Sequence, residues 1–315
     1  MKTIPIFFAA DNNYAGPLSA TIISIRENRS KAYNYRLVIM TDNMNEENRK
    51  MLSSVQEDKF TIEFKDVNDC LQTFKEKLVL RDYYTLSTYF RFFIPELFPE
   101  YSKALYLDSD LIITGDISKL FNTFVGPENY VGGINDDVVP ISPIFSEYVE
   151  KIVGVSRYRY FNAGVLLMNL KLFREEKIIE KFIEMVGKKR FVVAQDQDYL
   201  NALCKDRVQY IGHGWNKTAF FDENFDDNKA NLVHFKMSFK PWHYNGVHYE
   251  DRFWKYAEMS PFYNQLISTR DNYSKEEQER DKLAGEGLLN LAIKEVEDQE
   301  REMASDNEGV FYQKF

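Results

Sequence analysis

The chain has 315 residues and a globular composition, with 44% hydrophobic and 28% charged residues and only 14 Gly and 9 Pro. This length fits one large α/β enzyme domain with a short appendage. Asp and Glu outnumber Lys and Arg by 49 to 40, which gives a net charge of −9. Because nucleic acid is bound through basic surfaces that release counterions, this charge argues against nucleic acid as the main partner.

Cysteine usage and the lengths of the apolar runs predict the cellular compartment. The cysteines, Cys70 and Cys204, are far apart and too few for a disulfide framework, which favours a reducing environment. The apolar run at residues 4–10 is too short for a secretion signal, and no run approaches the roughly 18 residues of a membrane span. We therefore expect a cytoplasmic protein without a transmembrane segment, or one attached peripherally to the inner face of the membrane.

The first half of the chain alternates strand and helix patterns. Residues 4–10 are typical of a buried strand, and a polar turn at 11–14 separates them from a helical pattern over 17–27. A strand, a helix and a strand are predicted next, at 35–40, 45–55 and 61–64. This alternation predicts a mainly parallel sheet flanked by helices, with ligands bound beyond the carboxyl ends of its strands.

The second half continues with an aromatic helical segment at 85–93, which we expect to end at Pro95. The later predicted elements are strands at 104–107, 130–134, 163–168 and 231–233 and an amphipathic helix at 175–186. The strand at 104–107 runs directly into an acidic triplet. Because parallel strands share their carboxyl edge, this triplet and the turn at 11–14 are both expected at the ligand-binding edge.

Residues 261–315 are predicted to form a helical appendage to a domain spanning 1–260. Ser274 and Glu277 match a capping box at a helix start. The region 275–303 is rich in charge and carries a narrow apolar stripe at Leu283, Leu288, Leu291 and Val296. We expect a solvated helix that packs on its own domain, on a partner protein or on a second copy of the chain.

Two carboxylates follow the buried strand at 104–107. At strand spacing, Asp108 and Asp110 face the same side, and two like charges beside an apolar run are costly unless a cation lies between them. Hard oxygen ligands favour Mg²⁺ or Mn²⁺, and an added imidazole shifts the preference towards Mn²⁺. His234 offers such an imidazole after the strand at 231–233.

The acid pair also has other interpretations. An isolated Asp-x-Asp can be a solvated loop or a helix cap. It is also found in haloacid-dehalogenase-like phosphatases, in which Asp108 would be the nucleophile and Asp110 the acid, and Asp136 with Asp137 would imitate a further acidic motif. That phosphatase motif usually lies on the first strand, whereas here several predicted elements precede it.

Several short segments together resemble glycosyltransferase family 8, in that family's order over residues 4–245. They read FAADNNY at 8–14, YFRFFIPELFP at 89–99, LYLDSD at 105–110, FNAGVLLMN at 161–169, DQD at 196–198, and His234 with KPW at 240–242. The resemblance implies a GT-A fold with a Rossmann-like, mainly parallel sheet. It also implies a retaining, Mn²⁺-dependent transfer of a hexose from a UDP-sugar to a glycan or glycoprotein hydroxyl.

The resemblance further assigns the metal and the diphosphate. Asp108, Asp110 and His234 would bind Mn²⁺, with Mg²⁺ as the alternative, and the ion would neutralise charge on the UDP leaving group. Lys240 would add a second positive charge beside the diphosphate. The hexose is galactose or glucose, as in bacterial galactosyl- and glucosyltransferases, and the spacing of the motifs does not choose between them.

The same resemblance assigns different residues to the binding of the uridine and of the donor sugar. Asp11 and Asn13 would hold the uridine, Tyr14 would stack on the base, and Ala10 would contribute backbone contacts only. The donor sugar would contact four further residues, Arg91, Asp136, Asn162 and Asp196. A guanidinium fork and a carboxylate together satisfy vicinal hydroxyls, which suits Arg91 and Asp196.

Gln197 corresponds to the family position beside the anomeric carbon. An amide is a poor nucleophile, so we expect front-face transfer in which Gln197 stabilises the cationic centre through its carbonyl dipole. A non-catalytic UDP-sugar-binding protein is a further alternative, which the complete set of expected site residues disfavours. One position departs from the family: Met237 stands where members often have Gly close to phosphate, and this departure leaves the loop geometry and the diphosphate contacts open.

Overall fold

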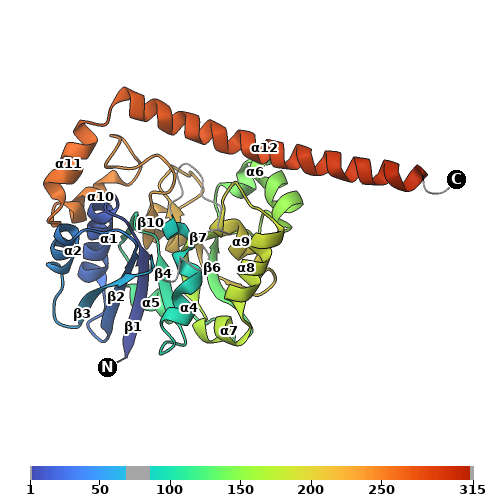
Figure 1. Ribbon diagram of the computed structural model, residues 1–315. Coiled ribbons are helices and arrows are strands. Elements are labelled where there is room, and N and C mark those ends of the chain that lie inside the picture. Colours follow the sequence, from blue (N-terminus) through green and yellow to red (C-terminus); the bar gives the residue numbers. More distant parts are fainter. Residues whose placement is uncertain (1, 69–85, 313–315) are drawn as a thin grey trace.

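A computed structural model of the chain describes residues 2–68 and 86–312. Cys70 and residue 85, the first of the predicted aromatic segment, lie outside these ranges. The described part contains a seven-stranded sheet in the order β3-β2-β1-β4-β7-β6-β8, with helices on both faces (Figure 1). This is the layered α/β architecture that the alternating pattern predicts.

The predicted elements of the first half are confirmed in order. They are β1 (Thr3–Ala9), α1 (Ala15–Asn28), β2 (Asn34–Thr41), α2 (Glu46–Ser53) and β3 (Phe60–Asp66). Asn45 caps α2, because its side chain accepts a hydrogen bond from the Asn48 N–H. The three strands pair in parallel, with Thr3 opposite Asn34 at the start of the ladder, so their carboxyl ends lie at one edge of the sheet.

The second half adds the remaining strands and one reversal of direction. These strands are β4 (Ala104–Leu107), β5 (Leu111–Ile113), β6 (Val131–Asn135), β7 (Phe161–Met168), β8 (Val208–Tyr210), β9 (Lys217–Thr218) and β10 (Leu232–His234). β4 is parallel to β1, whereas β7 runs antiparallel to both β4 and β6. The sheet is therefore mainly parallel, as predicted.

The helices of the second half differ from expectation at two points. They are η1 (Leu86–Phe93), α4 (Ile94–Leu97), α5 (Ile117–Phe121), η2 (Val139–Ile141), α6 (Pro143–Tyr148), η3 (Val149–Val153), α7 (Leu170–Glu175), α8 (Ile178–Lys188), α9 (Asp196–Cys204), η4 (His213–Trp215), η5 (Asp227–Lys229) and α10 (Glu250–Ala257). The aromatic segment is a 3₁₀ helix, and Pro95 lies in the first turn of α4, where no N–H partner is needed, instead of ending the helix. The helix predicted at 175–186 is divided between α7 and α8 at Lys177, whose φ is 52°.

The sheet separates two apolar cores. Ile4, Ile6 and Phe8 of β1 lie in the core that contains α1, whereas Phe7 lies in the core that contains the aromatic side chains of η1. This alternation follows the two-residue period of a strand. Because β1 is buried on both faces, its sequence is a continuous apolar run instead of an alternating one.

A second sheet has three strands in the order β5-β10-β9, and its strand β5 begins directly after the acidic triplet. β10 pairs antiparallel with β5, and His234 lies opposite Leu111 in that ladder. This pairing was not predicted, because β5 and β9 are too short to show a period. It brings His234 next to Asp110, although 124 positions separate them in the sequence numbering.

The C-terminal region forms two helices, α11 (Tyr263–Asp271) and α12 (Lys275–Tyr312). The predicted capping box is confirmed: Ser274 N–H donates to Glu277 Oε2 at 2.8 Å, and Glu277 N–H donates to Ser274 Oγ at 3.1 Å. α12 crosses the molecule above the carboxyl edge of the sheet and lies against α6 and η3 (Figure 1). Of the predicted stripe, Val296 is buried, whereas Leu283 is exposed.

Within the described ranges, no helix combines the length and the apolar character that crossing a membrane requires.

Replacing Ala292 with Asp should undock α12, because Ala292 is fully buried and an Asp there would place a carboxylate in an apolar core. We expect the free energy of unfolding to fall by about 2–4 kcal/mol and amide exchange over 288–300 to accelerate. Ile293→Asp is the matched control, since Ile293 is 38% exposed and should change stability by less than about 0.5 kcal/mol. Equal losses in both variants would contradict this docking.

Candidate functional site

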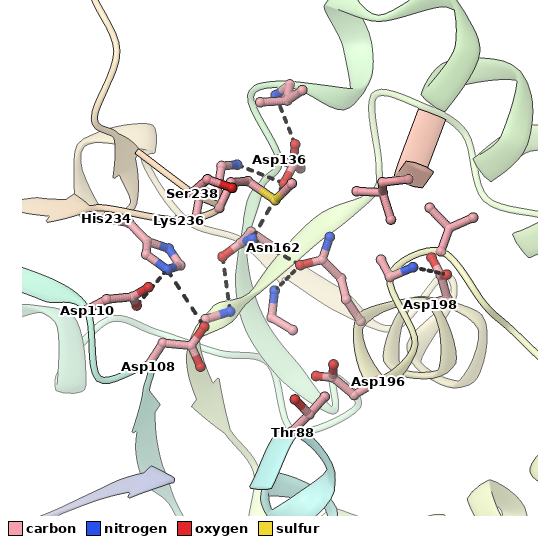
Figure 2. A pocket seen from close by; sticks show the side chains of 18 of the residues that line it. Thr88, Asp108, Asp110, Asp136, Asn162, Asp196, Asp198, His234, Lys236 and Ser238 are labelled. Carbon is pink, nitrogen blue, oxygen red and sulfur yellow. Dashed lines mark hydrogen bonds and ion pairs between the residues drawn. The ribbon is translucent and has the colours of Figure 1, made fainter. Parts of the chain in front are cut away.

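A cavity of about 610 Å³ lies beyond the carboxyl ends of β1 and β4 (Figure 2). Ser109 Oγ donates to the Ala9 carbonyl at 2.8 Å, which ties the acidic triplet to the turn after β1 as predicted. The sequence-predicted residues that line the cavity are Ala10, Asp11, Tyr14, Arg91, Asp108, Asp110, Asp136, Asn162, Asp196, Gln197, His234 and Lys240. Asn13 is exposed and is not part of the lining.

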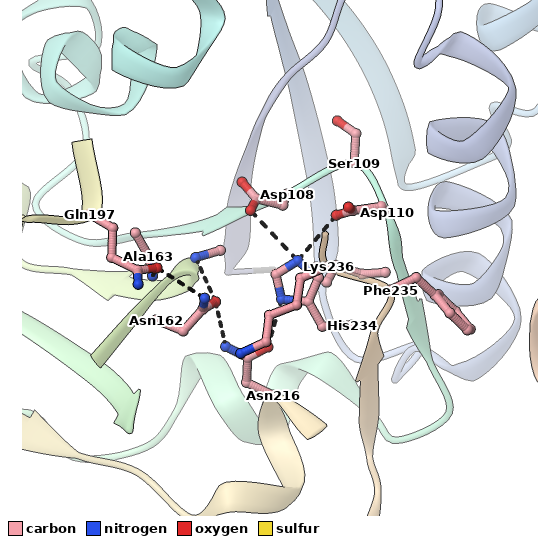
Figure 3. Close-up of polar contacts among 12 residues, drawn as sticks. Asp108, Ser109, Asp110, Asn162, Ala163, Gln197, Asn216, His234, Phe235 and Lys236 are labelled. Carbon is pink, nitrogen blue, oxygen red and sulfur yellow. Dashed lines mark hydrogen bonds and ion pairs between the residues drawn. The ribbon is translucent and has the colours of Figure 1, made fainter. Parts of the chain in front are cut away.

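Asp108, Asp110 and His234 form a compact cluster in this cavity (Figure 3). One potential ligand atom from each lies within 4.8 Å of the others. His234 Nε2 is 3.2 Å from Asp110 Oδ1 and 3.7 Å from Asp108 Oδ2. Two carboxylates and one imidazole are a donor set that suits Mn²⁺ and also accommodates Mg²⁺.

A chain of amides orients the imidazole of His234. The Gly164 N–H donates to Asn162 Oδ1, so that oxygen is an acceptor, and Asn216 Nδ2 must be the donor that contacts it at 2.9 Å. Asn216 therefore presents its oxygen to His234 Nδ1, 3.0 Å away. Nδ1 must therefore carry a proton, and Nε2 is the ring atom directed at the carboxylates, the orientation of a metal-ligating histidine.

The cluster leaves negative charge that a cation would balance. Asp110 Oδ1 is buried and accepts no hydrogen bond of normal geometry among the described residues. His234 Nε2 lies 3.2 Å from it as an ion-pair contact. A divalent ion placed among Asp108, Asp110 and His234 would accept a lone pair from each and neutralise the two carboxylates. The residues present therefore fit a metal.

Lys240 supplies positive charge on the same side of the cluster. Its Nζ contacts Asp110 Oδ2 and the Phe235 carbonyl, and the side chain is buried. Burial acts to raise the pKa of Asp110, but the charges of Lys240 and His234 outweigh it and hold that pKa below its usual range. Asp110 therefore stays ionised at neutral pH, the state that a metal ligand needs.

Arg91 joins the metal cluster to the remainder of the cavity. Its guanidinium is buried, with Nη2 3.2 Å from Asp108 Oδ1 and Nε 3.1 Å from Asp196 Oδ2, and it lies 4.3 Å from the centre of the Tyr106 ring. Arg91 is thus part of the cavity wall and not of a surface ion pair. Burial raises the pKa of Asp196 to about 7, and Arg91 opposes this shift while Asp108 and Asp198 add to it.

Gln197 is held by its carbonyl oxygen. That oxygen accepts hydrogen bonds from the Ala163 N–H at 2.9 Å and from Asn162 Nδ2 at 3.0 Å (Figure 3). The next acid, Asp198, is fully buried and accepts hydrogen bonds from the Tyr148 and Tyr160 hydroxyls. The side chain of Gln197 is consequently fixed at the cavity wall beside Asn162.

Lys236 is a cavity residue that the sequence analysis did not identify. Its Nζ lies 2.9 Å from both Asp136 Oδ2 and Asp137 Oδ1. Asp136 also accepts the backbone N–H groups of the two residues at 138 and 139, and Asp137 is turned towards Thr218. Its position two residues after His234 could have identified Lys236, because alternate residues of an extended segment point to the same side. Asn216 had no such local signal.

The residues expected to meet a nucleotide lie at one end of the cavity. Asp11 Oδ1 accepts the N–H groups of Asn13 and Tyr14 at 2.9 and 3.1 Å, which shapes the turn before α1. The Tyr14 ring is 37% exposed and lies edge-on to Trp242, 6.5 Å away between ring centres. Lys240 Nζ is 5.9 Å from the Tyr14 ring centre.

Met237, which stands where family members often have glycine, has a left-handed backbone conformation. Its φ is 64°, in the left-handed region that glycine adopts without steric cost. Its side chain is 56% exposed and borders the cavity. Met237 therefore has a backbone conformation that suits glycine while carrying a large side chain.

The fold and site define a class of protein that comparison with solved structures identifies as GT-A glycosyltransferases. The galactosyltransferase LgtC, solved with donor and acceptor sugar analogs, matches with a TM-score of 0.68 and 27% identity, covering 82% of this chain and 96% of that one. The bifunctional glycosyltransferase WbbM matches in fold with a TM-score of 0.75 and 24% identity, over 86% of this chain and 52% of that one.

The chain belongs to glycosyl transferase family 8, whose signature matches residues 5–246. A protein of Haemophilus influenzae named as a glycosyltransferase is 30% identical over 254 residues, which are 80% of this chain and 73% of that protein. The lipopolysaccharide 1,2-glucosyltransferase of Escherichia coli K12 is 26% identical over 279 residues, covering 83% of this chain and 79% of its own. The resemblance seen in the sequence is confirmed, and the acid pair lies in a glycosyltransferase and not in a haloacid-dehalogenase-like phosphatase.

Replacing Gly164 with Ala should disrupt the cluster, because a Cβ at this position would collide with His234 Cε1 and Asp108 Oδ2. We expect the affinity for Mn²⁺, measured by calorimetry, to fall at least about tenfold and the free energy of unfolding to fall by about 1–3 kcal/mol. The control is Gly187→Ala in α8, where a Cβ meets nothing within 4 Å. Unchanged Mn²⁺ affinity in Gly164→Ala would show that the ion binds elsewhere.

Proposed function

We propose that the protein is a retaining hexosyltransferase that moves galactose or glucose from a UDP-sugar to a hydroxyl of a glycan or glycoprotein acceptor. The observation that carries this proposal is the compact cluster of Asp108, Asp110 and His234, with one potential ligand atom from each within 4.8 Å of the others, in a cavity of a family 8 glycosyltransferase. A divalent ion, Mn²⁺ or alternatively Mg²⁺, is the ligand that this arrangement favours. We place the reaction in the cytoplasm or at the inner face of the membrane.

The three cluster residues would hold the ion next to the diphosphate. When bound, the ion supplies Lewis-acid stabilisation of the charge that develops on the UDP leaving group. Lys240 contributes a further positive charge from its position against Asp110. Asp11 and Tyr14, with the backbone of Ala10, would bind the uridine, since they line the cavity and Tyr14 lies near Lys240. Asn13, which is exposed on the same turn, would approach the uridine from outside the lining.

The donor sugar would occupy the part of the cavity between the cluster and α9. Arg91 and Asp196 lie there as a buried pair, and both can exchange part of their mutual contact for hydroxyl groups. Asn162 and Asp136 lie 3.4 Å apart between their amide nitrogen and carboxylate oxygen, and both face the same cavity. Lys236 positions Asp136 through the contact between its Nζ and Asp136 Oδ2.

Transfer would proceed on one face of the sugar. The acceptor oxygen bonds to the anomeric carbon as the bond from that carbon to the β-phosphate oxygen breaks, and the departing phosphate oxygen takes the acceptor proton. Gln197 would stabilise the positive charge at the anomeric centre with its carbonyl dipole, which the Ala163 N–H and Asn162 hold in place. The configuration at the anomeric carbon is retained, and the acceptor proton leaves on the departing phosphate.

The proposal predicts metal-dependent UDP release from one or two UDP-hexoses. In a panel of UDP-sugars assayed with Mn²⁺, Mg²⁺ or chelator, Asp110→Asn should reduce release at least about 100-fold, because it removes a charged ligand. Asp58→Asn is the matched control, since the Asp58 side chain is 90% exposed and distant from the cavity lining. Absence of release across the panel, together with hydrolysis of a phosphomonoester, would overturn the proposal.

The raised pKa of Asp196 predicts a pH dependence. With a pKa of about 7, this carboxyl is protonated below pH 7 and ionised above it, and only the ionised form accepts hydrogen bonds with both oxygens. We therefore expect kcat/KM for the UDP-sugar to rise as pH increases through about 7 and then level off. Asp196→Asn should lower kcat/KM and remove this inflection. An inflection that persists in Asp196→Asn would assign the titration to another group.

A further inference from the structure

One wall of the cavity comes from a helix outside the family match. The match ends at residue 246, and α12 begins at Lys275. Four residues of α12 line the cavity: Asp281, Ala284, Gly285 and Leu288. Their spacing is that of a single face of a helix. A segment that the family signature does not include therefore helps to enclose the site.

α12 is fixed in this position at both ends of its cavity-facing turn. At one end, Asp281 Oδ2 accepts hydrogen bonds from the Tyr244 and Tyr273 hydroxyls, each at 2.8 Å. The Tyr273 ring stacks on His243, with ring centres 4.1 Å apart and planes at 7°. At the other end, Ala292 is completely buried in the core beneath the helix. The wall is therefore part of the folded structure.

The α12 wall borders an apolar end of the cavity. Uncharged side chains from η2, α6, η3 and the residue preceding η2 line this part of the cavity, namely Val138, Val139, Phe145, Tyr148 and Val149, and most of them belong to one apolar cluster against which Leu288 packs. Leu288 of α12 adds a further apolar group to this end. The diphosphate and hydroxyl groups of a UDP-sugar need polar partners, which the charged end provides and this end does not.

Gly285 leaves space on the cavity side of the helix. A Cβ built at this residue meets no atom within 4 Å, and Gly285 belongs to the lining. A large side chain at this position would therefore extend into open space within the cavity. Gly287 also has nothing within 4 Å of its Cβ position, but it is not a lining residue. The two glycines form a matched pair on one helix.

We propose that α12 forms the acceptor side of the active cavity and that Gly285 sets the width of that side, so that the cavity takes an acceptor glycoside with an apolar aglycone. The inference rests on the proposed function, which assigns the charged end to the UDP-sugar. Once that end is filled, the apolar end is the continuation of the same cavity and the place for the second substrate. An alkyl chain there would contact Phe145, Val139 and Leu288, which gain by losing water.

The test compares octyl and methyl β-glucosides and β-galactosides as ligands. Their affinities are measured by calorimetry with UDP and Mn²⁺ present, at octyl glycoside concentrations below micelle formation. We expect the unaltered protein and Gly287→Trp to bind an octyl glycoside at least about tenfold more tightly than its methyl counterpart. Gly285→Trp should lose this preference while it binds UDP and Mn²⁺ as the unaltered protein does. Gly285→Leu replaces it if thermal unfolding shows that the Trp variant does not fold.

Two results would overturn the inference. One is equal affinity of the unaltered protein for octyl and methyl glycosides, and the other is an equal loss of octyl binding in the Gly285 and Gly287 variants. Failure of the unaltered protein to bind UDP with Mn²⁺ is a different outcome, because it would overturn the proposed function from which the acceptor assignment follows. The UDP titration and the glycoside titration therefore separate the two proposals.

Discussion

The concentration of carboxylates in one buried cavity is the constraint on which the rest of the site depends. Asp108, Asp110 and Asp196 would repel one another in this setting unless cationic groups lay among them. Arg91 bridges Asp108 and Asp196, and Lys240 contacts Asp110. These contacts balance part of the negative charge, and the remaining face of Asp108 and Asp110 is directed towards Nε2 of His234. In the function that we propose, a divalent ion would complete the balance and stabilise the charge on the departing phosphate.

The scaffold makes this concentration of charge possible by bringing three separate strands to one place. β4 delivers the acid pair, β10 delivers His234 through its pairing with β5, and β7 passes between β4 and β6 with Gly164 at the point of closest approach. The absence of a side chain at Gly164 allows His234 and Asp108 to lie against the β7 backbone. The amide chain through Asn162 and Asn216 then sets the tautomer of the imidazole.

The cavity combines segments within the family match with one helix outside it. The charged end is built from segments within the family match, between residues 5 and 246. The apolar end is closed by α12, which is anchored through Asp281 and packs on α6. Only the α12 part of the apolar end lies outside the match, and in our proposal this part faces the acceptor. The charge-rich helix predicted as an appendage thus lies over the active cavity, and Leu288 of its stripe lines that cavity.

Local pattern in the sequence was sufficient for the elements whose environment is uniform along their length. The run at 4–10 is apolar throughout because β1 is buried on both faces, and the spacing of Asp108 and Asp110 is enough to place both on one side of a strand end. The sequence by itself therefore determined the alternating fold, the acid pair and the family. Only the tertiary structure decided that β5 pairs with β10, that Asn216 orients His234, that Lys236 holds Asp136, and that Gly285 faces the cavity. Each of these depends on contacts between residues far apart in the chain, which no local period records.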